Sequence, residues 1–338
     1  MEHEIADRLV PEGTTAWVLS TGKAGHEVNC LGIAEALGIE PALRPVQPRA
    51  LFAALAPFGP IDPRDAPQRR AALLAPPFPD IALAAGRITV PYLRRVKRAS
   101  QRRTFTVFLQ DPRSGGSAAD VIWVPEHDRL RGPNVIVTLT SPHPLRPAAF
   151  AEARRRPDPR IARLGRPRVA LVLGGPSASH SFSERDVAAL AGIAGSLLRD
   201  GKSLMVTPSR RTPPGLLDAI AQSLGAAATA DRAFLWDGSG DNPYLHMLAH
   251  ADAILVTGDS VNMVGEAVAT GAPVHIYEPT GGNPKIDGFI DKLVAQGAAR
   301  RWRGTLEHWT YRPIDATAAI AREIAARYAL FKQTMPGL

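Results

Sequence analysis

The sequence predicts two tandem Rossmann-like α/β domains. Short apolar runs recur along the 338-residue chain and alternate with helix-like segments, which is typical of parallel sheets covered on both faces. This pattern stops in the Pro- and Arg-rich segment 142–168 and then starts afresh. A chain of this length also suits two domains of roughly 150 residues each.

The apolar runs place the strands and the domain boundaries. In the first half we expect strands within 16–19, 80–86, 105–111, 120–125 and 134–139, and in the second half within 168–175, 202–208, 251–258 and 273–279. We therefore predict an N-terminal domain over 1–150, a linker over 151–167 and a C-terminal domain over 168–314. The stretch 315–333 has the pattern of a strong helix with no strand after it, and we expect 315–338 to dock across the domain junction.

Composition and charge favour a globular chain with anionic partners. Apolar residues make up 45% of the chain and the net charge is +8, which suits a packed core and a phosphate or a phospholipid head group as partner. Aromatic residues are only 6% and do not alternate with the cations, which argues against nucleic-acid binding. The single Cys30, the lack of a secretory signal and the lack of a membrane-spanning apolar run predict a cytoplasmic protein that contacts the inner face of the cell membrane peripherally, if at all.

A glycine loop opens each predicted domain. In the first, Gly22, Lys23, Gly25 and His26 lie between a strand and a helix. Glycines let backbone amides approach a ligand, and the helix N-terminus favours an anion there. The alternative is a tight turn without a ligand, but such a turn requires neither the lysine nor the histidine.

The second domain repeats this arrangement with Gly174, Gly175 and Ser177, followed by a Ser183–Asp186 capping box. After the next strand, Arg210 and Arg211 stand where a guanidinium could hold phosphate. The alternative for this arginine pair is an ordinary solvated loop.

The segment TGDSVNMVGEAVATG, residues 257–271, carries an unexpected acid, Glu266, on a helix of small apolar residues. The spacing puts Asn262, Met263 and Glu266 on one helix face. A carboxylate two turns into this helix is well placed to accept hydrogen bonds from a ribose diol. The alternative is a surface glutamate that favours the helix.

Phosphate oxygens could contact Ser260 and the amides of the first turn of this helix. Either Asp259 or Ser260 could be the N-cap, with Gly271 ending the helix. Because a carboxylate would repel phosphate, we expect Asp259 to cap the helix instead of touching a ligand.

Acids and imidazoles follow several strands of the first domain, where a general base would be sought. They are Asp111, Glu126, His127, Asp128 and His143. The basic segment 90–103 carries Tyr92, Leu93 and Val96, which favour an amphipathic helix on an anionic membrane. A solvated helix face is the alternative.

Several of these motifs together resemble the bacterial branch of the mitochondrial fission family named for elongated mitochondria. They are GRITVPYLRR, LQDPR, VPEHD, GPNVI, TPSRRTP and TGDSVNMVGEA, and the resemblance runs from residue 16 to about residue 303. The layout is also similar to that of the transferase that adds N-acetylglucosamine to make lipid II. The resemblance implies a glycosyltransferase B-type fold with an interdomain cleft.

The resemblance also implies roles for particular residues. Glu266 would bind ribose, and the stretch from Gly258 through Ser260, Asn262 and Met263 would contact the diphosphate or base. The donor side would further include Gly174, Gly175, Ser177 and Arg210, and the acceptor side would include Gly22, Lys23, Gly25 and His26.

The main functional hypothesis is a hexosyltransferase-like glycosyltransferase that moves a sugar from a nucleoside-diphosphate sugar to an envelope glycan or lipid-linked acceptor. No metal ion or other cofactor is expected, because helix amides and arginine can neutralise the leaving diphosphate. His26, Asp111 and His127 are the candidates for the catalytic base. The alternatives are a nucleoside-diphosphate-sugar epimerase and a non-catalytic adaptor on membranes that uses Arg94, Arg95, Lys97 and Arg98.

Overall fold

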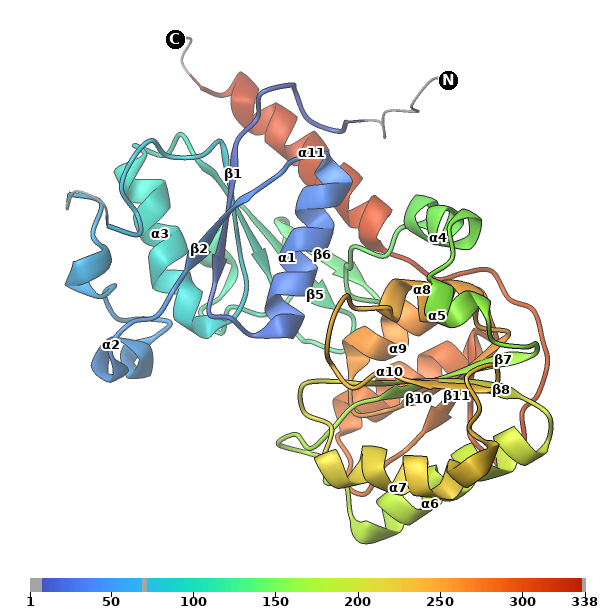
Figure 1. Ribbon diagram of the computed structural model, residues 1–338. Helices are drawn as coiled ribbons and strands as arrows, with labels where there is room; N and C mark the ends of the chain where they lie inside the picture. The colour runs from blue at the N-terminus through green and yellow to red at the C-terminus, as the bar shows by residue number, and fades with distance from the viewer. Residues whose placement is uncertain (1–7, 69–71, 336–338) are drawn as a thin grey trace. The chain divides into compact units, whose positions relative to one another are not determined.

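The chain contains two compact units, each built around one six-stranded parallel sheet (Figure 1). The structure is a computed structural model and describes residues 8–68 and 72–335. The first unit runs to Pro144 and resumes at Ala316, and the second spans Leu145–Asp315. The predicted pair of Rossmann-like α/β domains is confirmed.

The first sheet has the strand order β2-β1-β3-β4-β5-β6. Its strands are β1 (Ala16–Ser20), β2 (Ala42–Pro45), β3 (Ile81–Ala84), β4 (Phe105–Leu109), β5 (Val121–Pro125) and β6 (Val135–Thr138). The helices of this unit are α1 (Ala24–Leu37), α2 (Ala50–Leu55), α3 (Val90–Ala99) and α11 (Thr317–Gln333), with 3-10 turns η1 (Pro63–Asp65), η2 (Arg87–Thr89) and η3 (Gly116–Ala118).

The second sheet has the order β12-β11-β10-β7-β8-β9. Its strands are β7 (Arg168–Leu173), β8 (Ser203–Pro208), β9 (Ala233–Leu235), β10 (Ala253–Thr257), β11 (Val274–Tyr277) and β12 (Ala299–Arg301). The helices are α4 (Pro147–Arg155), α5 (Pro159–Ala162), α6 (Glu184–Arg199), α7 (Pro214–Leu224), α8 (Tyr244–His250), α9 (Val261–Val268) and α10 (Pro284–Ala295), with the 3-10 turn η4 (Gly225–Ala227).

Each sheet has one point where the strand order reverses. In the first sheet β1 pairs with β2 on one side and β3 on the other, and in the second β7 pairs with β8 on one side and β10 on the other. Open α/β sheets bind ligands outside the carboxyl ends of the strands at such a point. The loops after β1 and β3, and after β7 and β10, are therefore where a ligand site is expected.

All nine predicted strands form, and β2, β9 and β12 were not predicted. These three strands have only three or four residues each and lie at sheet edges. An edge strand is covered less completely than a central one, and β2 has no buried residue. β2 and β12 carry no continuous apolar run that could reveal them in the sequence, and the run of β9, AFL, has only three residues.

Two segments belong to different units from those expected. We predicted a linker over 151–167, but α4 and α5 lie within the second unit, where the Arg154 Nε donates to the Ala249 carbonyl oxygen at 3.0 Å. The C-terminal helix α11 forms part of the first unit's core and runs beside α1 (Figure 1). It buries Ile320, Ile324 and Tyr328 there.

Helix α3 corrects the prediction that residues 90–103 lay their apolar side chains on a membrane. Tyr92, Leu93 and Val96 are at most 1% exposed and pack in the core of the first unit with strand residues such as Phe108. The apolar face of α3 is therefore used by the fold, and only its basic face is left on the surface.

Candidate functional site

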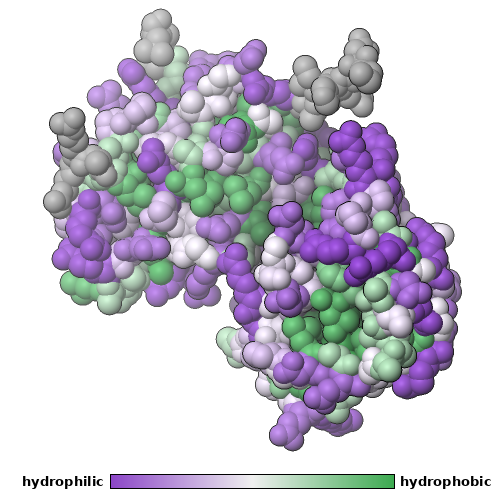
Figure 2. All heavy atoms as spheres, viewed as in Figure 1, coloured by the Kyte–Doolittle hydropathy of each residue, from purple (hydrophilic) through white to green (hydrophobic). Residues whose placement is uncertain are grey.

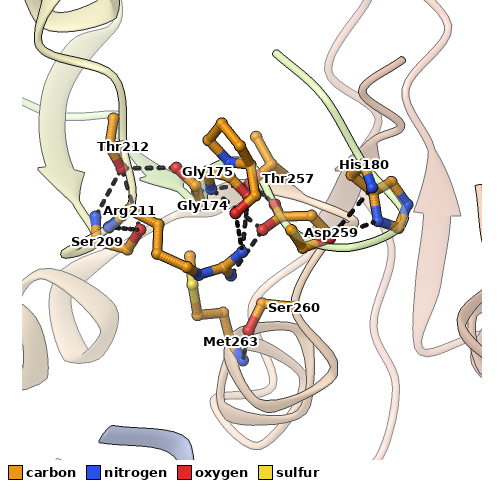
Figure 3. A network of polar contacts seen from close by, with 12 residues as sticks. Gly174, Gly175, His180, Ser209, Arg211, Thr212, Thr257, Asp259, Ser260 and Met263 are labelled. Carbon is orange, nitrogen blue, oxygen red and sulfur yellow. Dashed lines mark hydrogen bonds and ion pairs between the residues drawn. The ribbon is translucent and has the colours of Figure 1, made fainter. Parts of the chain in front are cut away.

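The carboxyl ends of β7, β8 and β10 are tied together by a polar network (Figure 3). The Gly174 amide donates to the Thr257 Oγ1 at 2.7 Å, and the Gly175 amide donates to the Asp259 Oδ2 at 3.1 Å. The Thr257 hydroxyl in turn donates to the other oxygen of Asp259 at 2.7 Å. The loops after β7 and β10 are thereby fixed to each other at the point where the strand order reverses.

Gly174 and Gly175 are required by this packing. A Cβ atom on Gly174 would overlap the Asp259 carboxylate, and one on Gly175 would overlap the Arg211 carbonyl oxygen. Both amides already donate inside the protein, so the predicted contact of these two amides with a ligand is not supported. Their role is to let the loops after β7, β8 and β10 approach one another closely.

Asp259 does not cap α9, contrary to our expectation. Its side chain is fully buried, and it accepts hydrogen bonds from the Gly175 amide and the Thr257 hydroxyl. The Arg211 Nη2 lies 2.9 Å from the Asp259 Oδ2 and neutralises this carboxylate. Because the charge is already matched, Asp259 does not have to repel a phosphate that approaches the neighbouring helix end.

Arg211, and not Arg210, is the arginine that the fold holds in place. Its guanidinium also donates to the carbonyl oxygens of Gly175 and Pro176, at 2.7 and 2.9 Å. Arg210 is exposed. The sequence could not separate the two, because the choice depends on which side chain faces the loop after β7.

Helix α9 begins at the predicted place. Ser260 is its N-cap, and the Ser260 Oγ accepts a hydrogen bond from the Met263 amide at 3.4 Å. Gly258 fits tightly, because a Cβ atom there would lie 3.1 Å from the side chains of Ile276 and Ile290. Asn262 lies in the first turn of α9, whose amino end follows the carboxyl end of β10 along the chain. This end favours an anion through the helix dipole.

Glu266 is buried on α9 and has one defined partner. Only 7% of the residue is exposed, and the Tyr244 hydroxyl donates to its Oε2 at 2.7 Å. Burial raises the pKa of Glu266 to about 7, although the hydrogen bond from Tyr244 opposes this rise. Burial, together with the charge of Glu266, raises the pKa of Tyr244 well above its ordinary value, which keeps the phenol a donor. The interpretation of Glu266 as an ordinary surface residue is wrong.

The raised pKa of Glu266 predicts a specific pH dependence of stability. The folded protein holds the proton of the Glu266 carboxyl group more tightly than the unfolded chain does. The stability that this proton contributes is therefore complete below pH 4.5, the ordinary pKa, and is lost as the pH rises to about 7. Within this window Glu266 should lower the free energy of unfolding by about 1.4 kcal/mol per pH unit. Chemical denaturation of the wild type and Glu266→Gln at several pH values measures the difference. Parallel pH profiles for the two proteins would contradict the prediction.

The loop after β7 contains a histidine that the sequence did not single out. His180 is 7% exposed, and its amide donates to the Ser177 Oγ at 3.1 Å. Asp186 fixes the following residues, because it accepts from Ser183 in the predicted capping box and from the Tyr277 hydroxyl at 3.0 Å. These bonds hold the pKa of Asp186 low, at about 2, against the effect of burial. Ser177 thus shapes a loop that is anchored at both ends.

The reversal point of the first sheet brings His26 against Gly86. The His26 ring is so close that a Cβ atom on Gly86 would lie 2.7 Å from its Cε1 and Nδ1 atoms. The His26 Nδ1 is buried and has no hydrogen-bond partner among the residues that the structure describes. Burial and the nearby Lys23 lower the pKa of His26, so the ring is neutral at pH 7. Sequence spacing alone could not reveal that Gly86, on the loop after β3, makes room for this ring.

The remaining residues of the first loop define its turn. Gly22 has a φ of 77°, which favours glycine, and its amide donates to the Ser20 Oγ at 2.9 Å. Lys23 is the exposed N-cap residue of α1, and Gly25 lies in the first turn of that helix. The predicted acceptor residues and His26 therefore lie on one loop at the reversal point.

Asp111 and His127 lie on the same edge of the first sheet but away from its reversal point. They follow β4 and β5, which are separated from β1 by one and two strands, or about 10 and 15 Å at the usual strand spacing. Asp111 accepts a hydrogen bond from the Arg113 amide at 2.8 Å, in a turn where Gln110 and Arg113 have positive φ angles. His143 lies beyond β6, where its backbone packs closely against Gly32 of α1.

Residues 8–68 and 72–335 contain no group of three His, Cys, Asp or Glu side chains arranged to hold a metal ion. In the same ranges, every helix is too short or too polar to cross a bilayer.

The fold is shared with proteins of known structure. The UDP-GlcNAc 2-epimerase from Methanocaldococcus jannaschii is 12% identical and matches with a TM-score of 0.53, covering 94% of this chain and 99% of that chain. The same enzyme in complex with UDP-GlcNAc and UDP gives a TM-score of 0.51. MurG from Acinetobacter baumannii, 14% identical, gives 0.49 over 95% of each chain. Together with the two parallel sheets, the similarity to the epimerase shows the glycosyltransferase B-type fold.

Sequence comparison identifies the family. The mitochondrial fission protein ELM1 of Arabidopsis thaliana is 28% identical over 279 residues, which are 74% of this chain and 65% of that protein. An uncharacterized protein of Rickettsia prowazekii (strain Madrid E) is 34% identical over 168 residues, which are 46% of this chain and 45% of that protein. The chain thus spans less than two thirds of the length of either relative. The model of the family described as Mitochondrial fission ELM1 matches residues 24–328, and the chain therefore belongs to this family.

Proposed function

We propose that the chain is a glycosyltransferase that binds a nucleoside-diphosphate sugar at the carboxyl ends of β7 and β10. The observation that carries this proposal is Glu266, a buried carboxyl group on the helix that follows β10 at the reversal point of the second sheet. Burial of an ionised carboxyl group is unfavourable unless hydrogen bonds or an opposite charge compensate for the lost hydration. The two hydroxyl groups of a ribose are suitable donors for the Glu266 carboxylate.

The surrounding residues fit the other parts of such a ligand. The amino end of α9, capped by Ser260, supplies partial positive charge for the diphosphate. Arg211 stands beside this end with a side chain that is 42% exposed. Metal-independent transfer is part of the proposal, because these groups can stabilise the charge that develops on the leaving diphosphate.

The first unit would bind the acceptor, for which we propose an envelope glycan or a lipid-linked sugar. In an inverting transfer the acceptor oxygen bonds to the anomeric carbon, the bond from that carbon to the diphosphate breaks, and a base takes the acceptor proton. His26 suits this role because its lowered pKa keeps the imidazole neutral and able to accept a proton. Its position at the reversal point of the first sheet supports the same choice.

Incubation with a nucleotide sugar tests the proposal. UDP-GlcNAc is the first donor to try, since the epimerase of similar fold is seen with UDP-GlcNAc and UDP. With donor alone we expect slow release of UDP and unchanged sugar configuration, and with a glycan acceptor we expect faster UDP release. Isomerisation of the sugar would indicate an epimerase instead. If no nucleotide sugar of any base is bound or consumed, the alternative of a non-catalytic adaptor on membranes becomes the better account.

A further inference from the structure

An apolar tip protrudes from the first unit. The tip consists of Leu51 and Leu55 on α2 and Phe58 just after it, which are 66%, 47% and 75% exposed. Among the described residues only five large apolar side chains are exposed to this degree, and these three lie within eight residues of one another. Figure 2 shows apolar residues beside hydrophilic ones where Figure 1 labels α2. Clustered exposure of this kind marks an interaction site more often than single exposed residues do.

The backbone of the tip is anchored from the side of η2 and α3. The Arg87 Nη1 donates to the carbonyl oxygens of Ala53 and Ala56, at 3.0 and 2.6 Å. The Arg94 Nη1 donates to the Pro57 carbonyl oxygen at 3.2 Å. Ala56 and Pro57 are buried, whereas Leu55 and Phe58 on either side of them face solvent. The tip is therefore held with its large apolar side chains outward.

The surroundings of the tip are strongly basic. Residues 42–68 and 87–98 contain eight Arg and Lys side chains and only two acids. One acid, Asp62, is fully buried and pairs with Arg49 and Arg64, whose side chains remain 55% and 54% exposed. The other, Asp65, accepts a hydrogen bond from the Tyr92 hydroxyl. Even when Asp120, which pairs with Lys97, is counted with these two acids, the cations outnumber the acids by eight to three, so the net charge around the apolar tip is positive.

We propose that the apolar tip docks on an anionic lipid bilayer. Leucine and phenylalanine side chains enter the boundary between head groups and acyl chains, while nearby arginines bind the lipid phosphates. The charge favours a bilayer over an apolar protein groove, because the excess of cations near the tip matches a negatively charged surface. This site replaces the membrane contact expected from Tyr92, Leu93 and Val96, which are buried. It does not depend on nucleotide binding.

Vesicle flotation of the full chain tests this proposal. The probes are phosphatidylcholine vesicles with and without about 30% phosphatidylglycerol. The wild type should float with the anionic vesicles only, and Leu51→Ser/Leu55→Ser/Phe58→Ser should reduce binding at least about tenfold. Arg98→Gln, on the exposed face of α3, should reduce it about fivefold. Raising the salt concentration from about 0.05 M to about 0.5 M should also weaken binding.

The matched control is Leu330→Ser, which removes another large apolar side chain, 62% exposed on α11. It should bind anionic vesicles as the wild type does. Circular dichroism should show that all variants are folded, since every substituted side chain is partly or largely exposed. The proposal is overturned if the wild type does not bind anionic vesicles, if the triple variant binds them equally well, or if Leu330→Ser loses as much binding as the triple variant.

Discussion

Gly175→Ala should prevent stable folding of the second unit. The new methyl group would overlap the Arg211 carbonyl oxygen, which is backbone and cannot rotate away as a side chain would. Relief would require the loops after β7 and β8 to separate, which would also break the hydrogen bonds from Arg211 to the Gly175 and Pro176 carbonyl oxygens. We expect a loss of more than about 4 kcal/mol in the free energy of unfolding.

Gly192→Ala is the matched control, because Gly192 lies within α6 and a Cβ atom there would meet nothing within 4 Å. This substitution should stabilise the helix by up to about 1 kcal/mol. Hydrogen–deuterium exchange of peptides from β7 and β10 would report on the second unit separately from the first. Wild-type protection of these peptides in Gly175→Ala would show that the loops are not held together as described.

His26→Ala should reduce the rate of sugar transfer by about 100- to 10,000-fold, the usual contribution of a general base. Donor affinity should remain within about twofold of the wild type, because a base that acts on the acceptor makes its contribution in the transition state. Since burial and Lys23 lower the pKa of His26, the wild-type rate should fall only when the pH drops below 6.5, the ordinary histidine value. Steady-state rates over a pH series measure both effects.

His127→Ala tests the same step with the other imidazole that the sequence suggested. His127 follows β5, away from the reversal point of the first sheet, so its loss should leave the rate nearly unchanged. If His127→Ala lost activity and His26→Ala kept it, the assignment of the base would be wrong. Loss of donor binding in His26→Ala would likewise point to a structural role for that residue.

The sequence predicted the strands of the two sheets better than their connections. Central strands such as β7 and β10 are fully buried and therefore apolar throughout. The C-terminal helix α11 was found by its pattern, but its partner was not, because the side chains of Ile320 and Ile324 indicate burial without indicating against which sheet. Chain order suggested a helix across the junction, whereas the core that it completes belongs to the first unit.

In the candidate site, Glu266 could be predicted from the sequence, but the residue that hydrogen-bonds to it could not. An acid among small apolar residues is visible in the sequence, whereas Tyr244 lies 22 residues away on α8, and nothing in its surroundings predicts that its hydroxyl reaches the Glu266 carboxylate. The loop glycines show the opposite case. Gly174 and Gly175 look like a phosphate-binding loop, but their missing side chains make room for Asp259 and Arg211. A glycine pattern does not reveal whether ligand or protein fills the space.

The most direct test of the central claim is calorimetric titration of the wild type and Glu266→Gln with UDP and 2′-deoxy-UDP at about pH 8, where Glu266 is ionised in the folded protein. If Glu266 binds ribose, the wild type should prefer UDP by about tenfold or more, the value of a hydrogen bond to a charged group, and the variant should bind both nucleotides almost equally. An equal preference for UDP in both proteins, or no binding of UDP or of any other nucleoside diphosphate by the wild type, would contradict the account.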